Sequence, residues 1–63
     1  MSEVKPGQVW QHKSTGGMWT VGEHPWTEGE RKWWHLHGVN SVKCKSVPEW
    51  MLLEDYVLVK EAP

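Results

Sequence analysis

Apolar and polar positions alternate along most of this chain, and that two-residue period is typical of β-strands. Glycines and prolines recur every few residues, so no segment keeps the three- and four-residue spacing of an amphipathic helix. Proline at position 48 and the spacing of Trp50 and Leu53 predict one helical or 3₁₀ turn over 48–53. The alternation predicts five short strands, at 8–12, 18–21, 32–37, 41–45 and 56–59.

The connections between these strands favour one fold. The polar segment 13–17, with two glycines, suits a hairpin, and a longer loop is expected over 24–30. Together with one helical turn before the last strand, this is the layout of a small all-β domain, a five-stranded SH3-like barrel whose closed sheet protects most edges. The alternative is an open sheet of three to five strands that dimerises to cover its apolar face. We expect one domain over 1–63, with flexible ends at 1–5 and 60–63.

The alternation also predicts which side chains point inward. In the third strand, Trp34 and Leu36 share one face. The opposite face carries Trp33, His35 and His37. The remaining core positions are expected to be Val9, Val21, Val42, Cys44, Trp50, Leu53, Val57 and Val59.

Aromatic composition changes this picture, because 63 residues include six tryptophans, one tyrosine and no phenylalanine. Each buried aromatic side chain removes about 150–250 Å² from water, so the core above already fills a small barrel. Four aromatic residues are then surplus, and Trp26 lies in the predicted loop. Exposed aromatics among polar groups are typical of protein interfaces. The surplus residues are Trp10, Trp26, Trp33 and Tyr56.

We therefore expect a non-enzymatic binding module that docks on a protein partner through an exposed tryptophan patch. A second interpretation has Trp10 and Trp33 covering the barrel ends or a dimer seam. A third has the same rings bind nucleic acid with help from Arg31, Lys32, Lys43 and Lys45, although the net charge of −1 and the mixed signs provide no basic block. The candidate binding residues are Trp26, Trp33, Trp10, His35, His37, Tyr56, Arg31 and Lys32.

Metal and catalytic sites are not expected. His35 and His37 share a face, but zinc needs three or four converging ligands and the predicted inward direction of Cys44 removes the third. Cys44 is not expected to be a nucleophile either, since a reactive thiol needs a partly exposed electropositive site and the flanking Lys43 and Lys45 face the opposite side of the strand. The paired carboxylates at 28/30 and 54/55 lie in no evident cleft. The sequence therefore predicts no enzyme activity, no cofactor and no metal.

A single cysteine and the lack of an apolar run of about 20 residues predict a cytoplasmic protein that does not enter membranes. We expect a monomer or a homodimer.

The first third of the chain carries a recognisable pattern: Lys-Pro-Gly, then an aromatic residue and a histidine, then a glycine turn, an aromatic residue and a valine. Its positions are Lys5, Pro6, Gly7, Trp10, His12, Gly16 or Gly17, Trp19 and Val21. This pattern resembles the start of many small phage and prophage proteins of unknown function, which begin Lys-Pro-Gly-x-x-Trp/Tyr-x-His. The resemblance implies a phage-encoded accessory protein with a barrel fold, whose partner is a host or phage protein.

Overall fold

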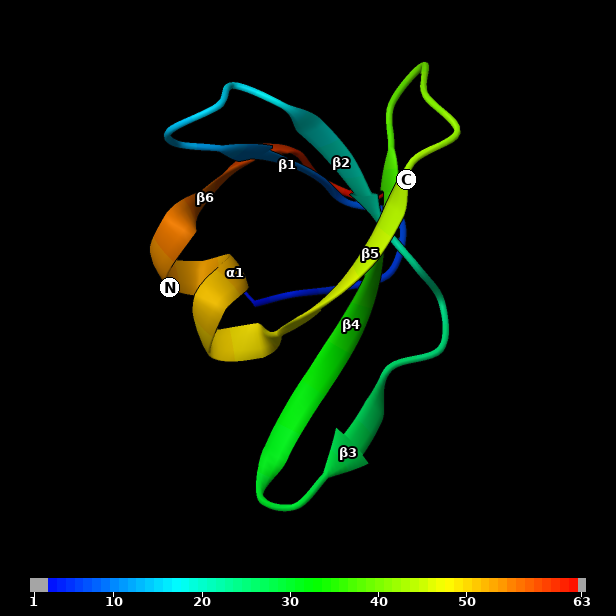
Figure 1. The fold of residues 1–63 in the computed structure, drawn as a ribbon, viewed down its shortest axis with the longest axis vertical. Helices are drawn as coiled ribbons and strands as arrows, with labels where there is room; N and C mark the ends of the chain where they lie inside the picture. Colours follow the sequence, from blue (N-terminus) through cyan, green and yellow to red (C-terminus); the bar gives the residue numbers. More distant parts are fainter. Residues whose placement is uncertain (1–2, 63) are drawn as a thin grey trace.

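A computed structural model describes residues 3–62. Over this range the chain is mostly β-structure with one short helix, which confirms the all-β prediction (Figure 1). The fold has six strands and not the expected five, because residues in the predicted 24–30 loop form an additional strand. In chain order the elements are β1 (Val9–His12), β2 (Met18–Val21), β3 (Trp26–Glu28), β4 (Arg31–Gly38), β5 (Cys44–Pro48), α1 (Glu49–Asp55) and β6 (Tyr56–Lys60).

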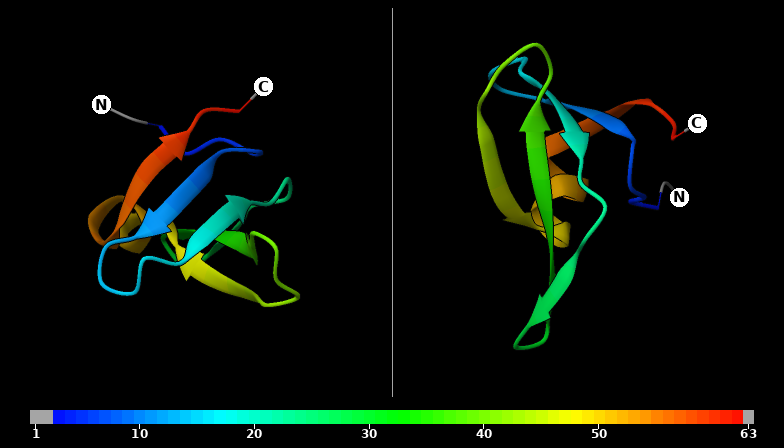
Figure 2. Two further views of the ribbon diagram at one scale, coloured as in Figure 1. Left: turned by 90° about the horizontal axis from the view of Figure 1, so that it is seen from above. Right: turned by 90° about the vertical axis from the view of Figure 1, so that its right-hand side faces the viewer.

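All neighbouring strands in the sheet run antiparallel. The order β6-β1-β2-β4 is continued by β5, and β3 pairs with the first part of β4. Since β5 pairs with β4 over 33–37, overlapping the partners of both β2 and β3, it must take the opposite edge of β4. The sheet curls around the core but stays open, and α1 links β5 to β6 across the gap (Figures 1 and 2).

Two glycine turns set the hairpins. Gly16, with φ 76°, lies in the β1–β2 turn, where its N–H donates to the His12 carbonyl. Gly29, with φ 66°, lies between β3 and β4, and the space around its Cα is open. Gly29 therefore serves the left-handed backbone conformation and not a close contact.

The core lies between the inner face of the curled sheet and α1. Its only buried polar side chain among the described residues, Gln8, accepts a hydrogen bond from Trp10 Nε1 at 3.0 Å. Gln8 Nε2 donates to the Glu3 carbonyl and to Glu61 Oε1, so one side chain joins both ends of the domain. The buried apolar residues are Val4, Trp10, Val21, Trp34, Leu36, Val47, Leu52 and Tyr56.

Both of the predicted flexible ends include residues that contact the rest of the domain. Val4 is only 5% exposed and packs in the core, and Lys60 still pairs with Val9. Residues 1–2 and 63, which also belong to that expectation, lie outside the described residues.

The predicted faces of β4 are correct, whereas the next strand is shifted. Trp34 and Leu36 are buried, as expected. The paired strand begins at Cys44 and not at residue 41, so Val42 lies fully exposed in the β4–β5 loop and Cys44 points outward. Val47 takes the core position. Because the side-chain period is two, this shift moved every inward position of the predicted strand.

In the first and last strands, too, the predicted inward side chains are the wrong alternate set. The large rings of Trp10 and Tyr56 point inward, so the prediction that they are surplus to the core is wrong. In a domain this small, one aromatic ring fills the volume of several aliphatic groups. The expected core residues Trp50, Leu53, Val57 and Val59 are instead about half exposed, and Val9 is half-buried.

Candidate binding surfaces

The outward face of β4 carries a cluster of rings. Pairing with β3 sets Trp26 directly opposite Trp33, and pairing with β5 sets Ser46 opposite His35. Alternate residues of a strand share a face, so Trp33 and His35 point to the same side, and Trp26 joins them across the ladder. We call Trp26, Trp33 and His35 the outer aromatic patch.

The rings of the patch contact one another. The Trp26 and Trp33 centroids are 6.3 Å apart with planes 14° apart, and Trp26 lies 4.5 Å from the His35 ring. His35 Nδ1 lies 3.2 Å from Ser46 Oγ, which fixes the orientation of the imidazole. Trp33 Nε1 is the one buried side-chain polar atom of residues 3–62 that has no hydrogen-bond partner. Both indoles remain half-buried, so part of each ring is accessible.

The other predicted binding residues are dispersed. His37 is exposed on the same face of β4 as the patch, whereas the ammonium of Lys32 lies 4.9 Å from the ring of buried Trp34. The guanidinium of Arg31 lies 5.9 Å from the Trp50 ring. Trp10 and Tyr56, each 3% exposed, have no accessible ring face for a ligand. The structure therefore brings together Trp26, Trp33 and His35, with His37 beside them.

Cys44 does not point inward, as the prediction against a zinc site assumed. Cys44 is exposed and is the cross-strand partner of His37, so its thiol and the two histidines are on one side of the sheet. Even so, within residues 3–62 no three His, Cys, Asp or Glu side chains are grouped closely enough to hold a metal ion.

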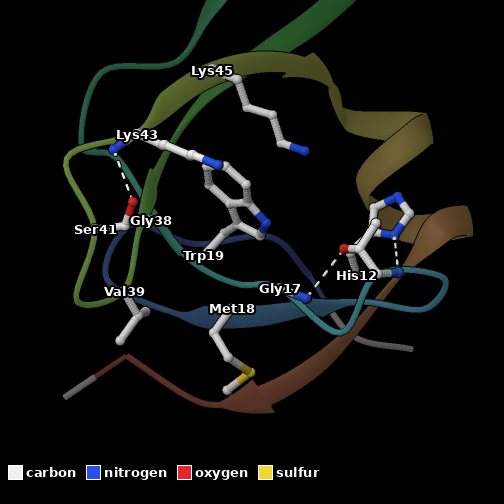
Figure 3. A pocket seen from close by; sticks show the side chains of 10 residues that line it. His12, Gly17, Met18, Trp19, Gly38, Val39, Ser41, Lys43 and Lys45 are labelled. Atoms are coloured by element: carbon white, nitrogen blue, oxygen red, sulfur yellow. Dashed lines mark hydrogen bonds between the residues drawn. The ribbon is translucent and has the colours of Figure 1, made fainter.

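A pocket of about 420 Å³ lies at the other end of β4, between the β1–β2 turn and the β4–β5 loop (Figure 3). The Lys45 ammonium lies 4.2 Å from the Trp19 ring and 5.2 Å from the Tyr56 ring. Figure 3 shows Lys45 extending toward the Trp19 indole, with Lys43 also at the pocket. The lining residues are His12, Thr15, Gly17, Met18, Trp19, Gly38, Val39, Ser41, Lys43 and Lys45.

Sequence reasoning missed this pocket because it placed Lys43 and Lys45 on the outer face. The signal was present in the spacing: Lys45 and Val47 are two positions apart in one strand, so an inward Val47 predicts an inward Lys45. Trp19 was assigned to neither the core nor the site.

A comparison with protein-family models, curated proteins and solved structures finds no match to this chain. The resemblance of residues 5–21 to phage proteins therefore stays a prediction. In the part of the chain that the structure describes, no helix is long and apolar enough to cross a membrane.

Proposed function

We propose that this protein is a non-enzymatic binding module that docks on another protein through its outer aromatic patch. The observation that supports this best is the stacked Trp26–Trp33 pair on a hairpin that extends away from the core (Figures 1 and 2). Trp and Tyr are the residues most enriched at the energetic centres of protein interfaces, because they supply large contact areas with few rotatable bonds.

The fold itself gains little from the extended part of the hairpin. None of residues 26–33 is buried, and the first buried side chain after β3 is Trp34. The Trp26–Trp33 stack therefore stabilises the hairpin but adds nothing to the hydrophobic core. A structured hairpin outside the core, with aromatic rings on one side, suits the recognition of a partner.

The surroundings of the patch match a protein interface. His35 and His37 are exposed beside the indoles, and the hairpin tip carries exposed Glu30 and Arg31. An aromatic centre with a polar rim of both charges is the usual anatomy of such an interface.

We also propose that the protein is an SH3-like barrel, phage-encoded and cytoplasmic. The strand order β6-β1-β2-β4-β5 and the helix before the last strand support an SH3-like barrel in which β3 is an addition. The resemblance of residues 5–21 supports a phage-encoded protein with a host or phage partner. The single exposed thiol, Cys44, suits a reducing cytoplasm.

The experiment compares Trp26→Ala and Trp33→Ala with the control Val59→Ala, which truncates a half-exposed apolar side chain of β6, outside the patch. Immobilised wild type and variants are incubated with bacterial lysate, half of it nuclease-treated, and the retained protein is identified, purified and titrated against each variant. We expect both patch variants to lose binding in both halves while they still unfold cooperatively, and Val59→Ala to bind normally. Loss of cooperative unfolding in both patch variants would return these rings to a structural role.

Nucleic-acid binding is the second candidate, favoured by Lys43 and Lys45 beside Trp19. Arg31 and Lys32, however, begin β4, whereas the two pocket lysines lie near its end. At about 3.3 Å per residue, the length of β4 separates the two pairs by roughly 20 Å, so these cations form no continuous strip. Steep loss of affinity with rising salt would favour this candidate over the protein-binding one.

A further inference from the structure

We propose that the pocket between the β1–β2 turn and the β4–β5 loop binds a small phosphomonoester, with its phosphate held by Lys43 and Lys45. This site is separate from the outer aromatic patch and does not depend on the function proposed for it.

The polar side chains lining the pocket have hydrogens to donate. Thr15 Oγ1 accepts from the Gly17 N–H at 3.2 Å and Ser41 Oγ accepts from the Lys43 N–H at 3.1 Å, which leaves both hydroxyl hydrogens free to donate. His12 Nδ1 accepts from the N–H groups of residues 14 and 15, so the neutral ring carries its proton on Nε2. With the two ammonium groups, these side chains form a set of donors.

Three backbone carbonyls at the pocket already accept a hydrogen bond. The Gly17 carbonyl accepts from the His12 N–H at 2.8 Å, and the Met18 carbonyl accepts from the Val39 N–H at 3.0 Å. The Lys43 carbonyl accepts from the N–H of residue 38 at 2.8 Å. No carboxylate is among the described residues that line the pocket. A ligand that offers only acceptor oxygens therefore matches the pocket best.

Charge selects a phosphate among such ligands. The ammonium of Lys45 is held against the rings of Trp19 and Tyr56, a contact that leaves its N–H donors available. A phosphomonoester carries a charge of about −1.5 to −2 at neutral pH, which two lysines balance better than they balance a monoanionic carboxylate. Lysine binds phosphate as a point charge.

The pocket is larger than a phosphate alone requires. Its volume of about 420 Å³ falls in the range of small-molecule sites, and Met18, Trp19 and Val39 supply apolar walls. We therefore expect the ligand to have an apolar or aromatic body attached to its phosphate, as a nucleoside monophosphate has.

The test is calorimetric titration with a nucleoside monophosphate, the matching nucleoside and inorganic phosphate. We expect saturable one-to-one binding of the monophosphate, weaker binding of inorganic phosphate and none of the nucleoside. NMR should show the largest shifts at the Trp19 indole N–H and the Gly17 amide. Equal binding of nucleoside and monophosphate overturns the proposal. Tighter binding of a single-stranded oligonucleotide without a terminal phosphate also overturns it, in favour of a nucleic-acid surface.

Variants locate the site. Lys43→Gln should weaken monophosphate binding by about tenfold, the loss expected for one charge-assisted hydrogen bond. Lys45→Arg keeps the charge and the ring contacts and should bind within about threefold of wild type. Its binding would show that a substitution in the pocket does not by itself disrupt the fold. Lys60→Gln removes the same charge from β6, outside the pocket, and should bind normally. Unchanged affinity in Lys43→Gln overturns the proposal.

Discussion

The indoles of the core and of the outer aromatic patch differ in how their N–H groups are satisfied. Trp10 Nε1 donates to Gln8 Oε1 at 3.0 Å, and Trp34 Nε1 donates to Glu49 Oε1 at 3.1 Å. Both rings are almost fully buried. Trp33 Nε1 is equally hidden from solvent but has no partner within the described residues.

This difference separates two uses of the same residue. A buried donor without an acceptor costs about 1–3 kcal/mol, so the core provides an acceptor for each of its indoles. At Trp33 in the patch, the fold provides no such acceptor. Core indoles should therefore govern stability, and patch indoles should govern binding.

The largest expected loss of stability comes from a substitution in the core. Trp34→Ala should lower the free energy of unfolding by about 3–5 kcal/mol, because it removes a fully buried ring and leaves a cavity. In a domain of this size such a loss approaches the whole stability. Urea denaturation should show an unfolded or barely folded variant. Trp50→Ala, at an exposed helix position, is the control and should unfold close to wild type.

The sequence predicted the strands better than the sides on which their residues lie. Alternation located most strands and the correct faces of β4, because Leu36 lies between two histidines and sets the phase of the strand. In β6 the run Tyr56–Val59 is apolar at every position, so alternation could not choose a phase and the ring volume of Tyr56 decided it. The placement of β5 depended on the loop after β4, where Asn40 adopts a φ of 58°.

The candidate sites were predictable to different degrees. Trp33 and His35 followed from the period of β4, but the contact with Trp26 depends on a hairpin register that no local pattern specifies. The pocket joins residues of β1, β2 and the β4–β5 loop, so only the folded arrangement brings Trp19 and Lys45 together.

Gln8→Ala would leave the buried Trp10 N–H without an acceptor, as the Trp33 N–H already is. We expect the free energy of unfolding to fall by about 1–3 kcal/mol, because a buried donor loses its acceptor and the hydrogen bonds to residues 3 and 61 are lost. Urea denaturation measures it, and the Trp10 indole N–H should exchange faster with solvent. Gln11→Ala, an exposed neighbour in β1, is the matched control. Equal stability of the two variants would contradict a structural role for the Gln8–Trp10 bond.

The Trp26–Trp33 contact should appear as a smaller coupling. In a double-mutant cycle of Trp26→Ala and Trp33→Ala, we expect an interaction energy of about 0.5–1.5 kcal/mol, as for other aromatic pairs. Each single variant should keep a cooperative transition, because neither ring belongs to the core cluster. Additive losses in the free energy of unfolding would mean that the two rings do not interact. Loss of the cooperative transition would mean that the patch is part of the core.

The smallest expected effect tests whether a core indole needs a charged partner or only an acceptor. Glu49→Gln keeps an oxygen for the Trp34 N–H and removes the negative charge from the first turn of α1. We expect the free energy of unfolding to fall by about 0.3–1 kcal/mol, the usual size of a charge effect at a helix N-terminus. High salt should reduce this loss, because salt screens the charge. Urea denaturation at two salt concentrations measures it, while NMR of the Trp34 indole N–H reports whether the bond persists. Glu54→Gln, an exposed carboxylate near the other end of the helix, is the control and should not lower stability. A salt-independent loss above about 2 kcal/mol would show that the Trp34 N–H requires the carboxylate itself, because hydrogen bonds to charged groups contribute about 1.5–3 kcal/mol.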